Sequence, residues 1–304
     1  CILFKVPHMN PTNSTNTLTI NGSNKWIKGK HKEGLIQMVG ADFITIRNLR
    51  IENTSSESGV IGLRMGQRAD YNTLDSCDIF LSGLTAFKQD SGAYVAIGAL
   101  GKHIGVPIEK HAGIGNTISN GHFYPKDSNS SGPYFGIYDR QGSKDYASIE
   151  TNNQFVKNRI DGFYSRGIYM AYVNGEECES NDITREHSTD KATMDSTVMG
   201  ILCLYGNSGS RSLKISGNRI HDLPKSNAVV PQSAAYPDNI KNVYGINLWY
   251  VVGTSKYPVE VFANELYNLR FHSLFSGILT QYGVLNKVME NGFVNIKGYT
   301  GYSY

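Results

Sequence analysis

A short motif that recurs along the chain constrains its fold more than any other feature of the sequence. In each copy an apolar residue is followed three positions later by a residue that is usually small or an amide, and two positions after that by another apolar residue. Asn occupies the central position of the last five copies without a break. The central residues are Leu49, Cys77, Gly121, Asn158, Asn181, Asn218, Asn264 and Asn291. A repeat of this kind indicates that one structural unit is stacked on near copies of itself.

The spacing of the motif indicates what the repeated unit is. The shortest interval between central positions, from Asn158 to Asn181, is 23 residues. Three short strands joined by three turns need about that many residues, since strands of ~3–10 residues are usual. Each copy is followed by Gly and a short apolar stretch, as in 167–170 and 200–203. We therefore predict an all-β fold, a parallel β-helix (β-solenoid) of about eight full rungs, whose longer intervals carry inserted loops.

Two columns of polar residues are expected to run along the coil. The first is the asparagine ladder at one corner, because Asn tolerates the left-handed backbone conformation of a sharp turn and its amide can bond to the rungs above and below. The second consists of the residue after each central position, where opposite charges are predicted to pair across rungs and to set the register. This second column reads Arg50, Asp78, His122, Arg159, Asp182, Arg219 and Glu265.

Segments 41–53 and 213–220 resemble the repeat of right-handed parallel β-helix proteins of the pectin-lyase-like kind. The resemblance covers residues 18–304 and implies the same fold. Together with Thr-Ile-Asn-Gly at 19–22, the chain is similar to large secreted or surface proteins of Bacteroidetes-type bacteria. That likeness implies an extracellular or bacterial cell-surface location. Residues 1–17 are expected to form an extended N-terminal lead-in.

The two ends of the sequence carry expectations of their own. The last residues, 301–304, read as the start of another strand, and no cap for the open edge of the coil precedes them. We therefore expect the β-helix to continue beyond residue 304 as part of a longer chain or assembly. Cys1 is either the lipid-bearing first residue of a bacterial lipoprotein or the boundary of a fragment, and the sequence leaves both possibilities open.

Charge and cysteine content argue against several functional classes. The net charge is +3, from 29 basic and 26 acidic residues, and no basic face is concentrated enough to predict a nucleic-acid partner. No apolar run reaches the ~18 residues of a membrane-spanning helix. The four cysteines lack metal-ligand spacing, so we expect neither a metal nor another cofactor. Cys178 and Cys203 fall at inward positions, where Cys behaves as a small hydrophobic residue.

The inserted loops flank the Gly-apolar strands on both sides, so the outward face of these strands is predicted to be the floor of a groove. Insertions in a solenoid often mark its binding face, and aromatic rings with polar tips suit the C–H patches and hydroxyls of sugars. We expect a polysaccharide, surface glycan or protein partner here, although the same rings could simply cover the coil. The predicted ligand-binding residues are Arg64, Tyr138, Tyr169 and Asn247 on the floor, with Tyr172, Tyr205, Trp249 and Tyr250 nearby.

Three carboxylates, Asp139, Glu186 and Asp190, are weak candidates for acid–base chemistry near this groove. The resemblance implies that a polygalacturonase-type hydrolase would carry an Asp-Asp pair and a Gly-His-Gly segment, and this sequence has neither. We therefore favour a non-catalytic stalk or adhesin segment that presents loops and an aromatic groove to its partners. The alternative is a polysaccharide lyase or glycoside hydrolase that acts in the groove.

Overall fold

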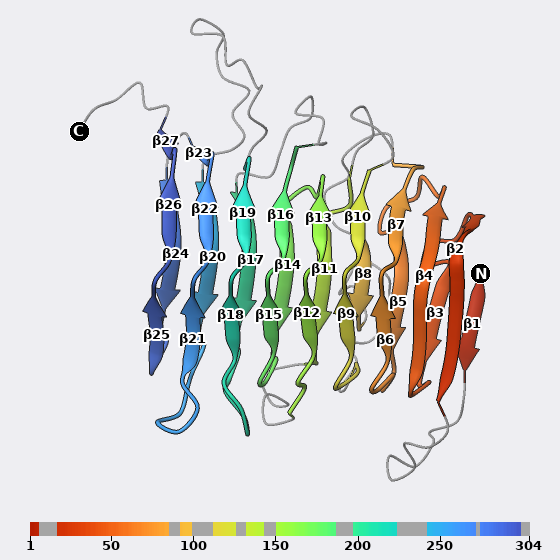
Figure 1. Ribbon diagram of the computed structural model, residues 1–304, viewed down its shortest axis with the longest axis horizontal. Helices are drawn as coiled ribbons and strands as arrows, with labels where there is room; N and C mark the ends of the chain where they lie inside the picture. Colours follow the sequence, from red (N-terminus) through yellow and green to blue (C-terminus); the bar gives the residue numbers. More distant parts are fainter. Residues whose placement is uncertain are drawn as a thin grey trace, which may run out of the picture.

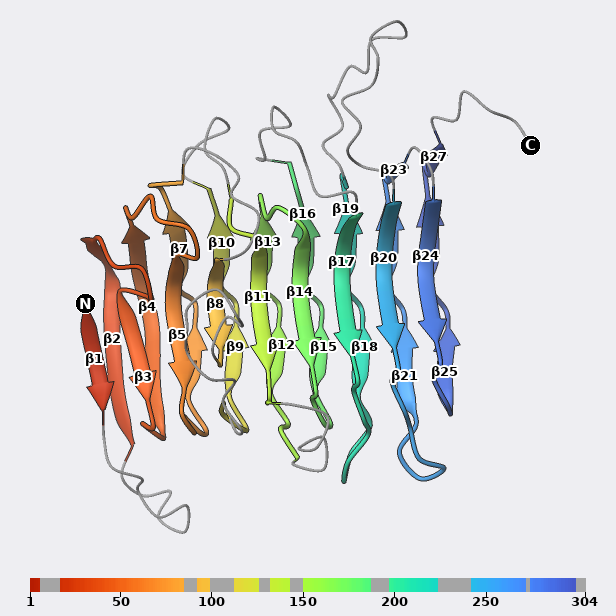
Figure 2. The same ribbon diagram turned by 180° about the vertical axis from the view of Figure 1, so that it is seen from behind.

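In the computed structural model the chain winds into a parallel β-solenoid, as the repeat predicts (Figures 1 and 2). The structure describes residues 1–5, 17–84, 92–98, 112–125, 132–142, 150–186, 197–223, 242–271 and 274–298. Over these ranges the strands pair in parallel from rung to rung, and no helix long and apolar enough to cross a membrane is found. The predicted fold class, an all-β solenoid, is confirmed.

Each full rung contributes one strand to each of three sheets, which we number 1 to 3 in chain order. Sheet 1 contains the Gly-apolar strands and has nine members, whereas sheets 2 and 3 are the two halves of a 16-stranded sheet joined by the long strand β4 (Ile44–Asn53). In Figures 1 and 2 the strands of sheet 1 run downwards and those of sheets 2 and 3 run upwards. The chain therefore turns from sheet 1 into sheet 2 at the lower edge of the molecule.

Sheet 1 consists of β1 (Ile2–Lys5), β3 (Ile36–Val39), β5 (Ile61–Gly66), β8 (Ala93–Ile97), β11 (Phe135–Arg140), β14 (Arg166–Ala171), β17 (Thr197–Leu204), β20 (Asn242–Trp249) and β24 (Leu274–Gln281). Sheet 2 consists of β6 (Thr73–Asp75), β9 (Thr117–Ser119), β12 (Gln154–Val156), β15 (Glu177–Glu179), β18 (Lys214–Ser216), β21 (Val259–Phe262) and β25 (Asn286–Met289). Sheet 3 consists of β7 (Asp78–Leu81), β10 (His122–Tyr124), β13 (Arg159–Asp161), β16 (Asp182–Thr184), β19 (Arg219–His221), β22 (Glu265–Tyr267) and β26 (Gly292–Val294). Strand β2 (Leu18–Gly29) pairs with β4, and β23 (Arg270–Phe271) pairs with β27 (Lys297–Gly298).

The first strand corrects the boundary predicted for the coil. Ile2–Lys5 pairs in parallel with Ile36–Val39, so β1 belongs to sheet 1 although it falls within the predicted lead-in of residues 1–17. Ile2–Lys5 reads Ile-Leu-Phe-Lys, a short apolar run of the kind that forms a strand. Residues 6–16 of the predicted lead-in lie outside the described ranges.

Apolar side chains fill the interior of the coil in columns that follow the strand register. Ile168, Ile201 and Ile246 stack in successive rungs of sheet 1 and are fully buried. The glycine before each of them marks a close approach between sheets. A Cβ added to Gly200 would lie 2.5 Å from Cγ2 of Ile220 in sheet 3 and 2.7 Å from the carbonyl oxygen of Gly245. The Gly-apolar motif therefore reflects a lack of space for a side chain.

The asparagine ladder lies at the corner between sheets 2 and 3, as predicted. The side-chain oxygen of Asn181 accepts hydrogen bonds from the backbone nitrogen of Asn158 at 3.0 Å and from its Nδ2 at 3.1 Å. Nδ2 of Asn181 donates to the carbonyl of Phe155 in the preceding rung at 2.8 Å. The same contacts link Asn181, Asn218, Asn264 and Asn291 in order. Each buried amide is thus satisfied by its neighbours, which fixes the rungs in register.

Of the two reasons that we gave for asparagine at this corner, the amide bonds between rungs are confirmed, but the left-handed conformation of Asn itself is wrong. The ladder asparagines do not have positive φ; the residue before each of them does, as at Lys157 (55°), Ser180 (55°) and Ala263 (54°). The left-handed turn is therefore made by residues of several types. Asn is used at the next position because its amide satisfies the backbone groups that the turn leaves unpaired in the coil interior.

A second, shorter amide ladder lies at the corner between sheets 1 and 2, five residues before the first, and was not predicted. The backbone nitrogen of Asn72 donates to Asn116 Oδ1, and that of Asn116 donates to Asn153 Oδ1, both at 2.9 Å. The strand register places Glu176 at the next position of this ladder. The sequence signal for it was Asn five residues before three consecutive central positions, Cys77, Gly121 and Asn158.

The predicted column of charges is confirmed by the register of sheet 3, which aligns its members rung by rung. Arg50 lies 3.2 Å from Asp78, and Asp182 lies 4.0 Å from both Arg159 and Arg219. Because these side chains face solvent, each pair contributes only about 0.2–1 kcal/mol. Their role is to favour this register over its alternatives.

Candidate functional site

The predicted groove floor on sheet 1 is mostly closed to solvent. Arg64, Tyr138 and Asn247 point outward as alternation requires, but they are only 5%, 3% and 4% exposed, and Tyr169 is half-buried. Arg64 forms an ion pair with Glu33 at 3.3 Å, and the rings of Tyr138 and Tyr169 stack at 5.2 Å. The expectation that these residues line an open floor is therefore corrected, since other parts of the protein cover Arg64, Tyr138 and Asn247 almost completely.

The other predicted aromatic residues form a continuous stack at the corner between sheets 1 and 2. Tyr172, Tyr205 and Tyr250 follow β14, β17 and β20, and Tyr282 follows β24 in the same position. Their ring centroids are 5.1, 5.2 and 4.7 Å apart in sequence order, and successive planes differ by 2°, 9° and 12°. We call these four residues the tyrosine column. Tyr282 was not among the predicted residues, although its place after a Gly-apolar strand was a usable signal.

Backbone geometry holds the tyrosine column in place. Tyr172, Tyr205 and Tyr250 each donate a backbone hydrogen bond to the rung that follows, at 2.8–2.9 Å, and all four tyrosines have a left-handed φ between 52° and 58°. Every ring therefore leaves the corner in the same direction. Since strands in neighbouring rungs are ~4.8 Å apart, their spacing brings the rings into stacking distance without further adjustment.

The stack determines which parts of the rings a partner can reach. Each inner ring has neighbours on both faces, yet Tyr205 and Tyr250 are 39% and 41% exposed. Their exposed surface is therefore made of ring edges and hydroxyls. Trp249 lies beside Tyr250 with a centroid distance of 6.3 Å and is also exposed, and the Arg140 guanidinium covers Tyr172 at 5.6 Å. The corner presents a row of phenol groups that can donate and accept hydrogen bonds.

Asp139, one of the three candidate acids, lies inside the coil and not at the edge of a groove. It is fully buried on the inward face of β11, where Gln141 Nε2 donates to it at 2.7 Å and Asn153 Nδ2 at 2.9 Å. Burial raises the pKa of Asp139 to about 7, although these hydrogen bonds oppose the shift. Alternation explains the position, because Ile137 and Asp139 share one face of the strand.

A second fully buried carboxyl group, Glu176, interacts with Asp139. Burial and the nearby Asp139 raise the pKa of Glu176 to about 8. Thr151 donates its hydroxyl to Oε1 of Glu176, whereas Oε2 has no hydrogen-bond partner. Two neighbouring buried carboxyl groups favour the protonated form, since a charge there would be neither solvated nor paired. This pair is part of the interior and has no open route to a substrate in the described residues.

Of the two remaining candidate acids, Glu186 falls within the described ranges. Glu186 is exposed and lies 3.4 Å from Nη2 of Arg159, and Asp190 falls outside the described ranges. Within the part of the chain that the structure describes, no three histidine, cysteine or acidic side chains are grouped so as to hold a metal ion. The buried thiols include Cys178, whose pKa is raised by burial.

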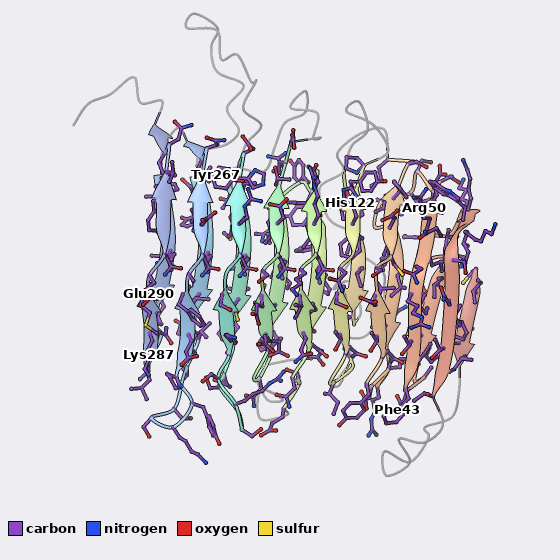
Figure 3. All side chains as sticks on the ribbon, viewed as in Figure 1. Phe43, Arg50, His122, Tyr267, Lys287 and Glu290 are labelled. Atoms are coloured by element: carbon purple, nitrogen blue, oxygen red, sulfur yellow. The ribbon has the colours of Figure 1, made fainter. Side chains whose placement is uncertain are left out.

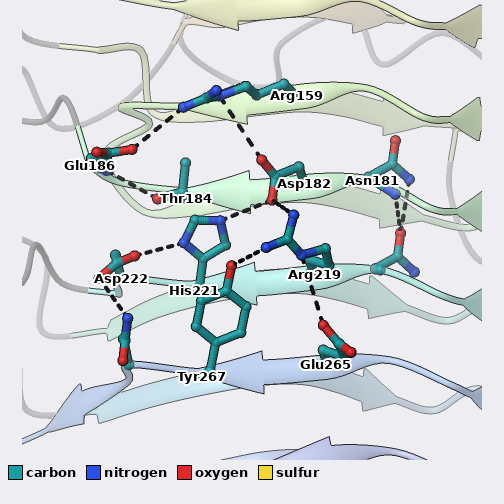
Figure 4. Close-up of polar contacts among 12 residues, drawn as sticks. Arg159, Asn181, Asp182, Thr184, Glu186, Arg219, His221, Asp222, Glu265 and Tyr267 are labelled. Carbon is teal, nitrogen blue, oxygen red and sulfur yellow. Dashed lines mark hydrogen bonds and ion pairs between the residues drawn. The ribbon is translucent and has the colours of Figure 1, made fainter. Parts of the chain in front are cut away.

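The outer face of sheet 3 carries a polar network that extends the charge column sideways (Figure 4). The buried ring of His221 contacts Asp182 through Nε2 at 2.9 Å and Asp222 through Nδ1 at 2.7 Å. Burial would lower the pKa of His221, but the two carboxylates outweigh it and raise the pKa. Tyr267 stacks flat on this ring, with centroids 4.6 Å apart, and accepts a hydrogen bond from Arg219 at 2.7 Å.

The sequence matches no protein-family model, and no curated protein matches it in sequence. Solved structures similar to this chain include PfbA, a surface adhesin of Streptococcus pneumoniae, at 12% identity and a TM-score of 0.46 over 87% of this chain and 63% of that one. Another is the GH136 lacto-N-biosidase from Eubacterium ramulus, at 12% identity and a TM-score of 0.40 over 90% of this chain and 51% of that one. The chain thus spans less than two thirds of either structure, and its fold class rests on its own strand pairing.

Proposed function

We propose that this β-helix belongs to an extracellular or cell-surface protein and binds a polysaccharide or surface glycan along the tyrosine column, without catalysis. The observation that carries the proposal is the row of exposed ring edges and hydroxyls at Tyr205, Tyr250 and Tyr282, fixed at the spacing of the rungs. A repeating polymer of hydroxyl-bearing units is complementary to a repeating row of phenol groups. The resemblance of segments 41–53 and 213–220 to the repeat of pectin-lyase-like proteins is consistent with such a ligand.

The chemistry of the corner favours a glycan over other polymers. Nucleic acid would require a stripe of basic side chains, whereas the described contacts of the column include a single guanidinium group, that of Arg140 over Tyr172. Sugars, in contrast, need hydroxyl partners and apolar edges, both of which tyrosine provides. Because the backbone of the corner is hydrogen-bonded from rung to rung, these groups are ordered before binding, which lowers its entropic cost.

Affinity electrophoresis through gels that contain single polysaccharides tests this proposal. The panel comprises neutral and acidic polysaccharides, and the variants are Tyr205→Ala and Tyr250→Ala. Removal of one aromatic contact is expected to weaken binding by roughly 2- to 13-fold, since each contributes about 0.5–1.5 kcal/mol. The double variant with Phe at both positions keeps the stack but loses two hydroxyls, so it should weaken binding nearly as much as Ala.

Tyr71 provides the matched control. It too has a left-handed φ (55°), is 44% exposed and stacks on a ring, that of Phe43, at 5.3 Å, but it lies outside the tyrosine column. Tyr71→Ala should leave retardation by polysaccharide unchanged. Equal losses in Tyr71→Ala and Tyr205→Ala, or no retardation by any polysaccharide, would contradict the proposal. New reducing ends or unsaturated products after incubation would instead support a lyase or hydrolase.

A further inference from the structure

The charge column on sheet 3 contains one position without a side chain. The register aligns Arg159, Asp182, Arg219, Glu265 and Gly292 in successive rungs. A Cβ added to Gly292 would meet no atom within 4 Å, and its φ is not in the left-handed region. Gly292 therefore differs from the glycines of sheet 1, such as Gly200, where a side chain would collide with the opposite sheet.

The missing side chain leaves a pocket on the outer face of sheet 3. Its volume is about 340 Å³, near the lower end of the roughly 300–1,000 Å³ of small-molecule sites. It is lined by Arg219, Glu265, Tyr267, Asn268, Gly292 and Val294, with the backbone of sheet 3 at its base. Tyr267 lies toward the upper edge in Figure 3, whereas the chain turns from sheet 1 to sheet 2 at the lower edge. The pocket is thus separate from the tyrosine column.

Two side chains that line this pocket, Tyr267 and Arg219, are held in place by contacts with other residues of sheet 3 and its edge (Figure 4). One face of the Tyr267 ring lies on His221, with an angle of 5° between the planes, and His221 is held in turn by Asp182 and Asp222. Arg219 Nη2 donates to the Tyr267 hydroxyl at 2.7 Å. A ligand therefore meets a tyrosine and a guanidinium group that are already positioned, which reduces the entropic cost of binding.

The polar groups of the pocket define the chemistry of its ligand. Glu265 is two-thirds exposed and lies 3.8 Å from Nε of Arg219, beyond hydrogen-bond distance, so both groups retain capacity for a ligand. The Tyr267 hydroxyl, which accepts from Arg219, keeps its own proton to donate. An anion would face Glu265 and a cation would face Arg219, so the pair favours a neutral ligand. Adjacent hydroxyls of a sugar can donate to the carboxylate and accept from the guanidinium group.

We propose that this pocket binds one neutral sugar residue, by hydrogen bonds to Glu265, Arg219 and the Tyr267 hydroxyl and by contact with the side chain of Val294. The site does not depend on the tyrosine column, because the two share no residue and lie on different faces of the coil.

Saturation-transfer-difference NMR of the full chain with free monosaccharides tests the site. The probes are glucose, galactose, mannose and xylose, with glucuronic acid and glucosamine as charged counterparts. At least one neutral sugar should bind, and its affinity should fall at least 10-fold in Gly292→Gln, whose side chain fills the pocket without collision. Glu265→Gln should weaken binding several-fold, whereas Tyr205→Ala should leave it unchanged.

The same experiment includes controls for the folding of the variant and for the preference for neutral sugars. Gly292→Gln should retain the urea midpoint of the wild type. A loss of sugar binding in this variant then results from the Gln side chain in the pocket and not from unfolding. The proposal is overturned if none of the neutral sugars binds, if Gly292→Gln binds as tightly as the wild type, or if glucuronic acid or glucosamine binds more tightly than its neutral counterpart. Loss of this binding in Tyr205→Ala would assign the sugar to the tyrosine column instead.

Discussion

The buried carboxyl pair Asp139 and Glu176 makes the stability of the coil depend on pH in an unusual direction. In the unfolded chain these groups lose their protons near their ordinary pKa values of 3.8 and 4.5, whereas in the fold burial raises the values to about 7 and about 8. Between these limits the folded state binds more protons than the unfolded state. Stability is therefore highest below about pH 4 as far as this pair is concerned, and it falls as the pH rises to about 8.

The size of the effect follows from the shifts. The rise of the pKa from 3.8 to about 7 for Asp139 and from 4.5 to about 8 for Glu176 sets an upper limit of about 4–5 kcal/mol for each carboxyl group, since a tenfold change in proton affinity corresponds to about 1.4 kcal/mol. Rearrangement and water entry reduce this figure, and we expect about 2–4 kcal/mol for replacement of Glu176. His221, whose pKa is also raised, loses its contribution in the same direction. A comparison of the wild type with Glu176→Gln removes the contribution of His221, which both proteins share.

The assay is urea denaturation of the wild type and Glu176→Gln at half-unit steps from pH 5 to pH 8. The amide has the shape of the protonated carboxyl group, so the two proteins should be similar at pH 5. At pH 8 the variant should be more stable by about 2–4 kcal/mol. Glu179→Gln in β15, the strand that follows Glu176, is the control, because Glu179 is partly exposed and pairs with Lys214 at 3.5 Å. Parallel pH profiles for the wild type and Glu176→Gln would refute the reasoning.

Two further predictions concern the packing of the coil. Asn218→Ala should lower the free energy of unfolding by about 3 kcal/mol, because it removes the acceptor of the buried Asn181 backbone N–H and the side-chain donor to the Cys178 carbonyl. Urea midpoints should show a smaller loss for Asn291→Ala at the half-buried end of the ladder. Gly200→Ala should cost about 1–3 kcal/mol through its collision with Ile220, and an equal midpoint for Gly200→Ala and the wild type would show that sheets 1 and 3 are not in close contact.

The fold could be predicted because its strongest constraints are local and repeated. Inward apolar positions and glycines recur along the coil, and a corner amide recurs in the last five copies of the motif. Asn158 and Asn181 are close enough in sequence to give the length of one coil. Residue preferences alone could not show whether Asn adopts the left-handed φ of the turn itself or supplies its side-chain amide at the next position. Asn favours left-handed φ in general, but here Lys157 and Ser180 adopt it, because the amide is needed one position later.

The candidate site was only partly predictable, because exposure depends on contacts between distant segments. Tyr205 and Tyr250 were identified from their place after a strand, and the rung spacing then determines that they stack. The burial of Tyr138 does not follow from its outward position in a strand. Asp139 shows the opposite difficulty: alternation places it inside, and its charge argues against that placement until Asn153 and Gln141 are seen to bond to it.

The central claim, that a glycan binds along the edges and hydroxyls of the tyrosine column, is tested most directly by NMR of protein labelled with 13C in its tyrosine rings. An oligosaccharide of the polysaccharide that binds most tightly is titrated into the sample. We predict that ring signals of Tyr205, Tyr250 and Tyr282 shift, while those of the control Tyr71 and the buried Tyr94 remain in place. Binding that shifts Tyr71 and leaves the column unchanged would contradict the account.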